Sequence, residues 1–585
     1  MTIRVAIIGA GPGGLVTLKT LLEASKPDRQ IEAYLFEAES DVGGTFNYRS
    51  YENAELVSSK QLTTFSDHRL PLETPDHVSL PEYVDYLRSY VERFNLAPYI
   101  KFNSPVIRVS PLDDDSKWAH RVRYVDRNGE DETKESIFEC SHIAVCTGLH
   151  VEPNIPDIPG IENIKGDVFH SSLYKGRDQV AGKRVLVLGC GETAMDIAYE
   201  SIKANAESVT MCFRTGFLFS PSSSADSSGG LPIDGLITNL FETAYVHQAV
   251  AQSRLRWFIS DFVIKRVLWF LTGTQAGMNQ HVGALPNDRL GRAFVFLNKS
   301  SKAMPYLNRP YKTHNPFLAY IGNRYIDPPE DAASDRVVDT CTWPEYVDDT
   351  GRVHFQSNPK RKDWQRLKDR NIQPNCVVYC SGYKQTFPYL DPSYPTASDA
   401  QIRNIINPSH PDISFIGFVR PGVGAIPPIA EQQAMWWTTL ITGRMQIPTD
   451  PPHYHLLAAK SSRIQYGVDH SAYMSTLAKD FGGAPSLLEL YRRHGLQILL
   501  IYCFGASFVT FYRLMGPFES SVAPEIARTE LAETILRRGY IGNLFFGAIP
   551  MLFYGVVNAV AYLLDKVGLL PSEAEVDCGE MSKRV

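Results

Sequence analysis

The sequence has few cysteines and places them in no spacing typical of a metal or redox site. Nine cysteines are scattered over 585 residues, and no CxxC pair occurs among them. An odd, scattered set does not build a disulfide scaffold, and the missing CxxC spacing argues against a zinc ribbon or a dithiol site. No cluster of His and Cys residues has the spacing of metal ligands, so we expect no metal. This composition fits a reducing, intracellular compartment.

Excess positive charge and a secretory leader are also missing. The chain carries 58 basic and 64 acidic residues, a formal net charge of −6, which gives no reason to expect a nucleic-acid partner. The apolar stretch after Arg4 is interrupted at Gly9 and Gly11, which indicates a strand and a glycine turn rather than a signal peptide. The content of 44% hydrophobic and 21% charged residues is ordinary for a globular protein. At this length several domains are expected.

The N-terminal residues have the pattern of a βαβ unit. Residues 5–8 form a short apolar run, residues 15–24 have helical spacing, and residues 33–36 form a second run. A GxGxxG turn separates the first run from the helix and comprises Gly9, Gly11, Pro12, Gly13 and Gly14. Such glycines let a pyrophosphate approach the N-terminus of the helix. Glu37 closes the next strand and is placed to accept ribose hydroxyls, so this unit predicts an FAD or NAD site.

The same pattern begins afresh about 180 residues later. An apolar run at 185–188 precedes a predicted helix at 193–204 and a strand at 208–213, and the turn between the first two comprises Gly189, Gly191, Glu192, Thr193 and Ala194. The following strand ends at Arg214 without a carboxylate, and a cation there suits the 2′-phosphate of NADP. Two dinucleotide sites in one chain imply hydride transfer from a nicotinamide to a flavin.

A motif just before the second turn resembles a known family. Ile164-x-Gly166-x-x-x-His170-x-x-x-Tyr174 is similar to the FxGxxxHxxx[YF] fingerprint of flavin-containing monooxygenases. Related Baeyer–Villiger enzymes usually carry Trp at the last position, so Tyr174 favours the N- and S-oxidising branch. Further matches are Gly44, Thr45 and Phe46 in a GG[TV]W-like element, Thr147 and Gly148 in one interdomain linker, Ser381 and Gly382 in the other, Phe65-Ser66-Asp67, and Glu431 with Gln433. The resemblance covers residues 3–447.

This resemblance implies a complete reaction cycle and candidate site residues. NADPH would bind at the second turn and reduce FAD at the first, and a C4a-hydroperoxyflavin would transfer one oxygen atom from O2 to a small organic substrate. The family usually has Asn where this chain has Val57, so stabilisation of the peroxide would have to come from Ser58, Ser59 or Lys60, or be weaker. The catalytic candidates are Ser58, Lys60 and His170. His170 could instead organise the linker by hydrogen bonding, and Lys60 could be a solvated charge.

Gly166 and Tyr174 are also assigned to the cofactor site by the resemblance. Gly166 is expected to serve a backbone conformation, while Tyr174 would pack near the nicotinamide or in the core. Three functions stay open. They are oxygen transfer to N or S, a Baeyer–Villiger or uncoupled NADPH oxidase reaction, and a non-catalytic membrane-bound flavoprotein.

We expect an α/β fold with two Rossmann-like dinucleotide-binding domains and a helical, hydrophobic C-terminal region. The FAD domain is predicted to be discontinuous, and the domain ranges are 1–155 for its first part, 156–374 for the NADPH domain with an insertion at about 216–340, 375–450 for the second part of the FAD domain, and 451–585 for the C-terminal region.

Two C-terminal segments lack charge. Residues 496–512 and 541–564 contain none, and the second is long enough to cross a bilayer as a helix. We therefore expect membrane association, at the endoplasmic reticulum with the catalytic domains in the cytosol. The alternative is a cytoplasmic enzyme with a hydrophobic hairpin packed against its body. The sequence indicates no oligomeric state.

Overall fold

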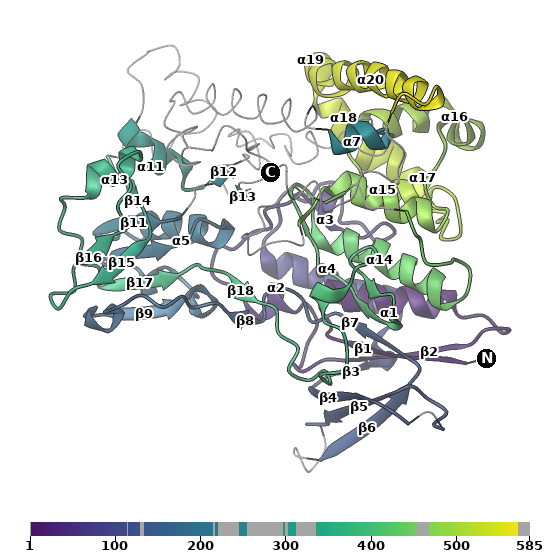
Figure 1. Cartoon of the computed structure of the whole chain (residues 1–585), viewed down its shortest axis with the longest axis horizontal. Helices are drawn as coiled ribbons and strands as arrows, with labels where there is room; N and C mark the ends of the chain where they lie inside the picture. Colours follow the sequence, from purple (N-terminus) through teal and green to yellow (C-terminus); the bar gives the residue numbers. More distant parts are fainter. Residues whose placement is uncertain are drawn as a thin grey trace.

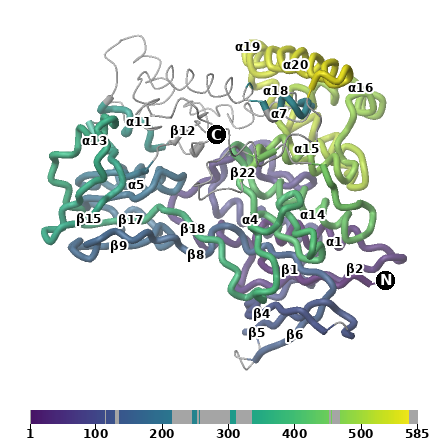
Figure 2. Tube along the Cα trace, viewed as in Figure 1, coloured from purple at the N-terminus to yellow at the C-terminus, as the bar shows by residue number. Residues whose placement is uncertain are grey.

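A computed structural model gives the fold of the chain (Figure 1). It describes residues 2–113, 115–128, 134–214, 217–219, 245–253, 255, 296–298, 302–311, 335–450, 454–455 and 467–570. Most of the predicted insertion at about 216–340 lies outside these residues. Figure 2 follows the path of the chain through two lobes and a C-terminal helical region, which lies over the first lobe.

The first lobe is built on a six-stranded sheet with the order β19-β20-β7-β1-β2-β3, in which every pairing but β19–β20 is parallel. Its strands are β1 (Ile3–Ile8), β2 (Ile31–Phe36), β3 (Ile100–Lys101), β7 (His142–Val145), β19 (Ile406–Asn407) and β20 (His410–Phe415). Helices α1 (Pro12–Ala24) and α14 (Ile426–Ile441) pack against each other here. The apolar, β-branched strands are buried because helices and loops cover the sheet.

The second lobe carries a five-stranded sheet with the order β14-β11-β10-β17-β9, in which all pairings are parallel. Its strands are β9 (Asp167–His170), β10 (Arg184–Leu188), β11 (Ser208–Cys212), β14 (Val338–Cys341) and β17 (Cys376–Tyr379), and α5 (Glu192–Lys203) joins β10 to β11. The expected α/β fold with two Rossmann-like units is confirmed. One boundary needs correction, because β17 was expected in the second part of the FAD domain, at 375–450, but pairs with β10 and β9.

The two uncharged C-terminal segments differ in environment. Residues 496–512 are split between α16 (Leu487–Phe504) and the 3₁₀ helix η9 (Val509–Arg513), and Ala506–Met515 is buried against the first lobe. Within the described residues, one helix is long and apolar enough to cross a membrane, namely Gly539–Lys566, which ends in α20 (Ile549–Lys566). Only 22% of its most apolar window is buried. The end of the first segment is therefore part of the protein interior, although Leu496 and Leu500 near its start are 57% and 48% exposed. The second segment carries exposed apolar surface along most of its length.

Candidate functional site

The first glycine turn has the geometry of a phosphate cradle. Gly9 adopts φ +103°, and a Cβ on Gly14 would lie 1.8 Å from the Gly9 carbonyl oxygen, so neither position accepts another residue without a shift. A Cβ on Gly11 would meet no atom within 4 Å. The open space at Gly11 lies where α1 begins at Pro12, and its unpaired N–H groups favour an anion there. This arrangement fits the pyrophosphate of a dinucleotide.

Glu37 is fixed beside the first turn at the end of β2. Its Oε2 accepts a hydrogen bond from the Ala10 amide at 2.5 Å, and its Oε1 accepts one from the Glu39 amide at 3.0 Å. The side chain is only 7% exposed, and burial raises the pKa of the carboxyl group. The predicted ribose-binding residue is therefore held against the turn. Gly44, at φ +54°, brings a second turn to the same place, because its Cβ would lie 3.3 Å from the Gly11 Cα.

Two further predicted cofactor residues follow Gly44. Thr45 begins the short helix α2 (Thr45–Tyr48), and the ring of Phe46 packs edge-on against Tyr83 with centroids 4.9 Å apart. Phe46 is thus anchored between the turn and helix α4 (Leu80–Arg93).

The second glycine turn repeats this geometry. Gly189 adopts φ +143°, with a Cβ that would lie 2.2 Å from the Cys380 carbonyl oxygen, while a Cβ on Gly191 would meet nothing within 4 Å. Helix α5 begins at Glu192, so Thr193 lies in its first turn, and Ala194 is fully buried. A second dinucleotide phosphate therefore fits beside Gly191.

Arg214 follows β11 at the carboxyl end of the second sheet. Its side chain is exposed, and the guanidinium carbon lies 4.7 Å from the centre of the Trp343 ring. This stacking holds the cation in place without occupying its hydrogen-bond donors. The geometry fits the predicted contact with a 2′-phosphate.

Replacing Arg214 by glutamine tests that contact. We expect the KM for NADPH to rise about tenfold, or about 1.4 kcal/mol, while the KM for NADH stays unchanged, because only NADPH carries the 2′-phosphate. Steady-state kinetics with both nucleotides measure the difference. Arg184→Gln, at the opposite end of the neighbouring strand β10, is the matched control. A preserved KM for NADPH in Arg214→Gln would assign the 2′-phosphate to other residues.

His170 joins the second sheet to a linker. Its Nδ1 accepts a hydrogen bond from the Ser172 amide at 3.1 Å, and its Nε2 donates to the Gly382 carbonyl at 3.0 Å. This pairing defines a neutral ring with the proton on Nε2, and burial lowers the pKa of His170. The geometry supports the linker role that was the alternative to proton transfer.

The remaining linker residues form hydrogen bonds with neighbouring loops. Thr147 lies 3.2 Å from the hydroxyl of Tyr389, and Ser381 donates to the Asn154 carbonyl. Gly148 and Gly382 both have positive φ, at +78° and +75°. Both linkers thus turn at their glycines, between the two lobes.

Gly166 and Tyr174 occupy packed positions. A Cβ on Gly166 would lie 1.9 Å from the Asn375 carbonyl oxygen, so a close backbone approach requires glycine there. Tyr174 is 1% exposed, belongs to the core of the second lobe, and packs against Tyr51 with ring centroids 5.6 Å apart. Of the two expectations for Tyr174, the geometry supports packing in the core.

The side chains of Lys60 and Ser58 both donate hydrogen bonds to backbone carbonyl groups. The Lys60 ammonium donates to the carbonyls of Pro71, Leu72 and Thr74 at 2.6–2.8 Å, and Ser58 donates to the Gly424 carbonyl at 3.1 Å. Burial lowers the pKa of Lys60. These three bonds use every donor hydrogen of the ammonium group. We infer that Lys60 positions the loop at 71–74 rather than contacting the flavin.

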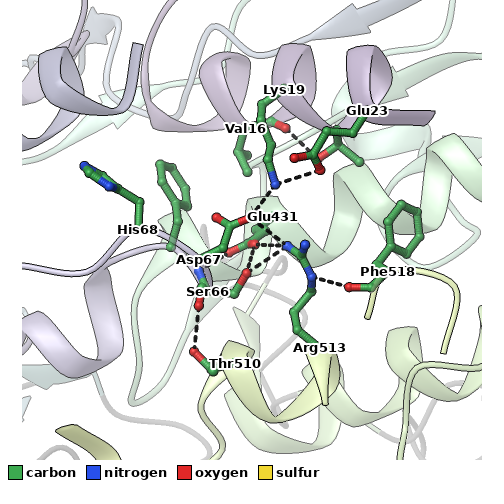
Figure 3. Close-up of polar contacts among 12 residues, drawn as sticks. Val16, Lys19, Glu23, Ser66, Asp67, His68, Glu431, Thr510, Arg513 and Phe518 are labelled. Atoms are coloured by element: carbon green, nitrogen blue, oxygen red, sulfur yellow. Dashed lines mark hydrogen bonds and ion pairs between the residues drawn. The ribbon is translucent and has the colours of Figure 1, made fainter. Parts of the chain in front are cut away.

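The sequence did not predict a buried charge cluster that joins α1, α14 and residues 66–67 to Arg513 (Figure 3). Glu431 in α14 accepts hydrogen bonds from the Ser66 amide and from Arg513, and Asp67 pairs with both Lys19 in α1 and Arg513. The cations hold the pKa of Asp67 below its usual value against the effect of burial, while burial and the Asp67 charge raise that of Glu431. Ser66, Asp67 and Glu431 were recognised as family landmarks, but no sequence signal paired them with Arg513, which lies 447 residues after Ser66 and 82 residues after Glu431.

Comparison with known proteins identifies the class. The sequence matches the family described as flavin-binding monooxygenase-like over residues 2–278 and 367–534, and it belongs to this family. The match extends beyond the resemblance seen at 3–447 and includes Arg513. The chain is therefore a flavin-dependent monooxygenase, an oxidoreductase that uses FAD and NADPH, with a small molecule and O2 as substrates.

Individual relatives and one solved structure are similar over most of the chain. The chain is 40% identical to Monooxygenase PC-14 of Penicillium crustosum, over 92% of this chain and 93% of the relative. It is 26% identical to human flavin-containing monooxygenase 2, over 88% of this chain and 89% of that protein. Among solved structures, S-allyl-L-cysteine S-oxygenase from Allium sativum shares the fold with a TM-score of 0.54 at 17% identity, over 92% of this chain and 99% of that one.

Proposed function

We propose that the protein oxidises a small organic substrate at a nucleophilic nitrogen or sulfur atom. One oxygen atom of O2 enters the substrate and the other leaves as water, while NADPH supplies two electrons. The observation that carries this proposal is the pair of glycine turns, each with a buried framework and open space at its second glycine, Gly11 or Gly191. Bound FAD would accept the hydride and activate oxygen.

The protein's residues bind and orient these groups. The α1 N-terminus and Gly11 would hold the FAD pyrophosphate, with Glu37 on the ribose, and the α5 N-terminus and Arg214 would hold NADPH. His170 fixes the linker at Gly382 and so sets how the two lobes face each other. The protein must also exclude water from the reduced cofactor, because solvent access diverts reduced oxygen to hydrogen peroxide.

Two observations support a nitrogen or sulfur acceptor. Relatives at 26% identity include the N-oxide-forming dimethylaniline monooxygenase 2 of Rattus norvegicus. Tyr174 also occupies the position at which related Baeyer–Villiger enzymes usually carry Trp.

The test is NADPH consumption under ¹⁸O2 with matched tertiary amines, thioethers and cyclic ketones. We expect ¹⁸O in an N-oxide or sulfoxide, in proportion to the NADPH consumed. Labelled lactones from the ketones alone would instead establish a Baeyer–Villiger enzyme and overturn the proposal.

An uncoupled NADPH oxidase is the second candidate, and Val57 favours it. Val57 has no hydrogen-bonding side chain, and its neighbours Ser58 and Lys60 both donate to backbone carbonyls. We expect Val57→Asn to lower the fraction of NADPH electrons released as peroxide at least about threefold, because an amide adds a donor worth about 1 kcal/mol. Peroxide and NADPH assays on the same sample measure this fraction. Val151→Asn, at an exposed valine, is the control; an unchanged fraction in Val57→Asn would make residue 57 irrelevant to leakage.

We also propose that the segment Gly539–Lys566 binds a membrane, at the endoplasmic reticulum with the catalytic lobes in the cytosol. Tyr540, Leu552 and Leu563 are 95%, 72% and 65% exposed, whereas Tyr554 and Asn558 are buried on the opposite face of the helix. Asn558 accepts a hydrogen bond from the His247 amide at 2.8 Å, so this face is seated on the protein. A helix seated in this way presents its apolar face to lipid without leaving the protein.

Charged substitutions on this face test membrane binding. The double variant Leu552→Glu/Leu563→Glu should abolish co-flotation with phosphatidylcholine vesicles while leaving NADPH oxidation unchanged, because it adds two charges to the lipid-facing side. The control is Ile137→Glu, at a residue 59% exposed on the first lobe. If the double variant floats as well as Ile137→Glu does, this face does not bind the membrane. A wild-type protein that does not float at all would leave the cytoplasmic alternative.

A further inference from the structure

The C-terminal region holds one stretch of the first lobe through three ion pairs. We call residues 509–538 the C-terminal clamp and residues 58–76 the clamped segment. The pairs are Arg513–Asp67 at 3.2 Å, Glu530–Arg69 at 2.7 Å and Arg537–Asp76 at 2.7 Å. The Glu530–Arg69 pair is bidentate, with a second bond of 2.8 Å, and both its side chains are at most 8% exposed. Bidentate pairs of this kind fix orientation as well as distance.

Apolar and neutral contacts accompany these pairs. Leu62 of the clamped segment is buried in one cluster with Phe511 and Leu531 of the clamp. The Thr510 hydroxyl donates to the Ser66 carbonyl at 3.2 Å. The clamp therefore contacts the clamped segment near its start, its middle and its end.

Hydrogen bonds within the clamped segment also connect its beginning to its end, so that it moves as a unit. Lys60 bonds three carbonyls between Pro71 and Thr74, its amide donates to the Asp76 carbonyl at 2.7 Å, and Gln61 donates to the Asp76 side chain at 2.8 Å. A displacement at Asp76 would thus reach Lys60 directly, and Ser58 lies two residues further on.

The opposite side of the clamped segment contacts α1, which begins at the first glycine turn, and α14, which packs against α1. Asp67 pairs with Lys19 in α1, the helix that begins beside Gly11, and Ser66 binds Glu431 in α14. Ser58 donates to the Gly424 carbonyl just before α14. Figure 3 shows Arg513 at the centre of this junction, directed toward both Asp67 and Glu431.

We propose that the C-terminal clamp positions residues 58–76 at the flavin site and so limits the release of reduced oxygen as peroxide. This inference rests on the proposed function, since peroxide release presumes reduction by NADPH. Arg513, Glu530 and Arg537 are positioning residues, because they act through the clamped segment. The C-terminal region is then required for coupled turnover, whether or not a membrane is present.

The test uses the full-length holoenzyme and alters the Arg537–Asp76 pair. This pair is the least buried of the three, so its loss should disturb folding least. In Arg537→Gln we expect amide hydrogen exchange in residues 60–76 to accelerate about tenfold and the peroxide fraction to rise at least about threefold. The KM for NADPH should not change, and Arg537→Lys should restore most of the wild-type behaviour because it keeps the charge. Arg366→Gln breaks a pair with Asp339 in the second lobe, where the side chains have similar exposures of 24% and 14%, and serves as the control.

The outcomes separate the inference from the function on which it rests. Exchange and peroxide release equal to those of wild type in Arg537→Gln would overturn the clamp, as would equal effects of Arg366→Gln. A wild-type enzyme that does not oxidise NADPH would contradict the proposed function. Hydrogen exchange needs no turnover, so it would still show in that case whether the C-terminal clamp holds residues 60–76. If Arg537→Gln does not fold, Asp76→Asn probes the same pair from the other side.

Discussion

Replacing Gly11 by valine is expected to yield a folded protein without colour. Gly11 has φ −69°, which valine adopts without strain, and a Cβ there meets no protein atom within 4 Å. The added side chain would instead fill the space through which the pyrophosphate approaches the α1 N-terminus. We expect FAD affinity to fall at least about 100-fold, or about 2.7 kcal/mol, while the melting temperature of the apoprotein stays unchanged.

Flavin absorbance after gel filtration and titration with free FAD measure this effect. Gly14→Val is the informative contrast, because its Cβ would lie 1.8 Å from the Gly9 carbonyl oxygen and should destabilise the fold itself. A Gly11→Val protein that retains FAD with wild-type affinity would show that the first turn is not the flavin site.

Replacing Gly191 by valine is expected to yield a yellow protein that NADPH no longer reduces efficiently. Gly191 has φ −74° and the same open surroundings as Gly11. The valine would obstruct the nucleotide phosphates at the α5 N-terminus without reaching the FAD turn in the other lobe. We expect the rate of flavin reduction at low NADPH concentration to fall at least about 100-fold, or about 2.7 kcal/mol.

Anaerobic stopped-flow reduction at several NADPH concentrations measures this loss, and chemical reduction by dithionite is the control that the flavin remains reducible. Gly11→Val and Gly191→Val serve as controls for each other, since each should remove one cofactor and spare the other. Unimpaired reduction of Gly191→Val by NADPH would place the nicotinamide nucleotide elsewhere.

The dinucleotide units could be predicted from sequence because their determinants are local. The predicted strands 5–8 and 185–188 lie within β1 and β10, and both turns have the predicted glycine geometry at Gly9 and Gly189. The apolar runs, the glycines and the helical spacing fall within about 35 residues in each unit, so a single pattern specifies each of them.

Strand partners and charge partners could not be predicted, because they are set by contacts across the chain. The apolar sequence of β17 is typical of a buried strand in either sheet, and only its pairing with β10 assigns it to the second sheet. Lys60 is a family landmark, yet its three carbonyl partners depend on the fold of the loop at 71–74. Arg513 follows an uncharged stretch that resembles a membrane segment, and its burial between Asp67 and Glu431 becomes visible only in three dimensions.

The central claim is that electrons pass from a nicotinamide at the second turn to a flavin at the first. Mixing the purified yellow protein with NADPH in the absence of oxygen tests it most directly. The account predicts that the visible flavin absorbance bleaches on mixing and returns when oxygen is admitted. A protein that binds FAD but stays yellow with excess NADPH, although dithionite bleaches it, would contradict the account.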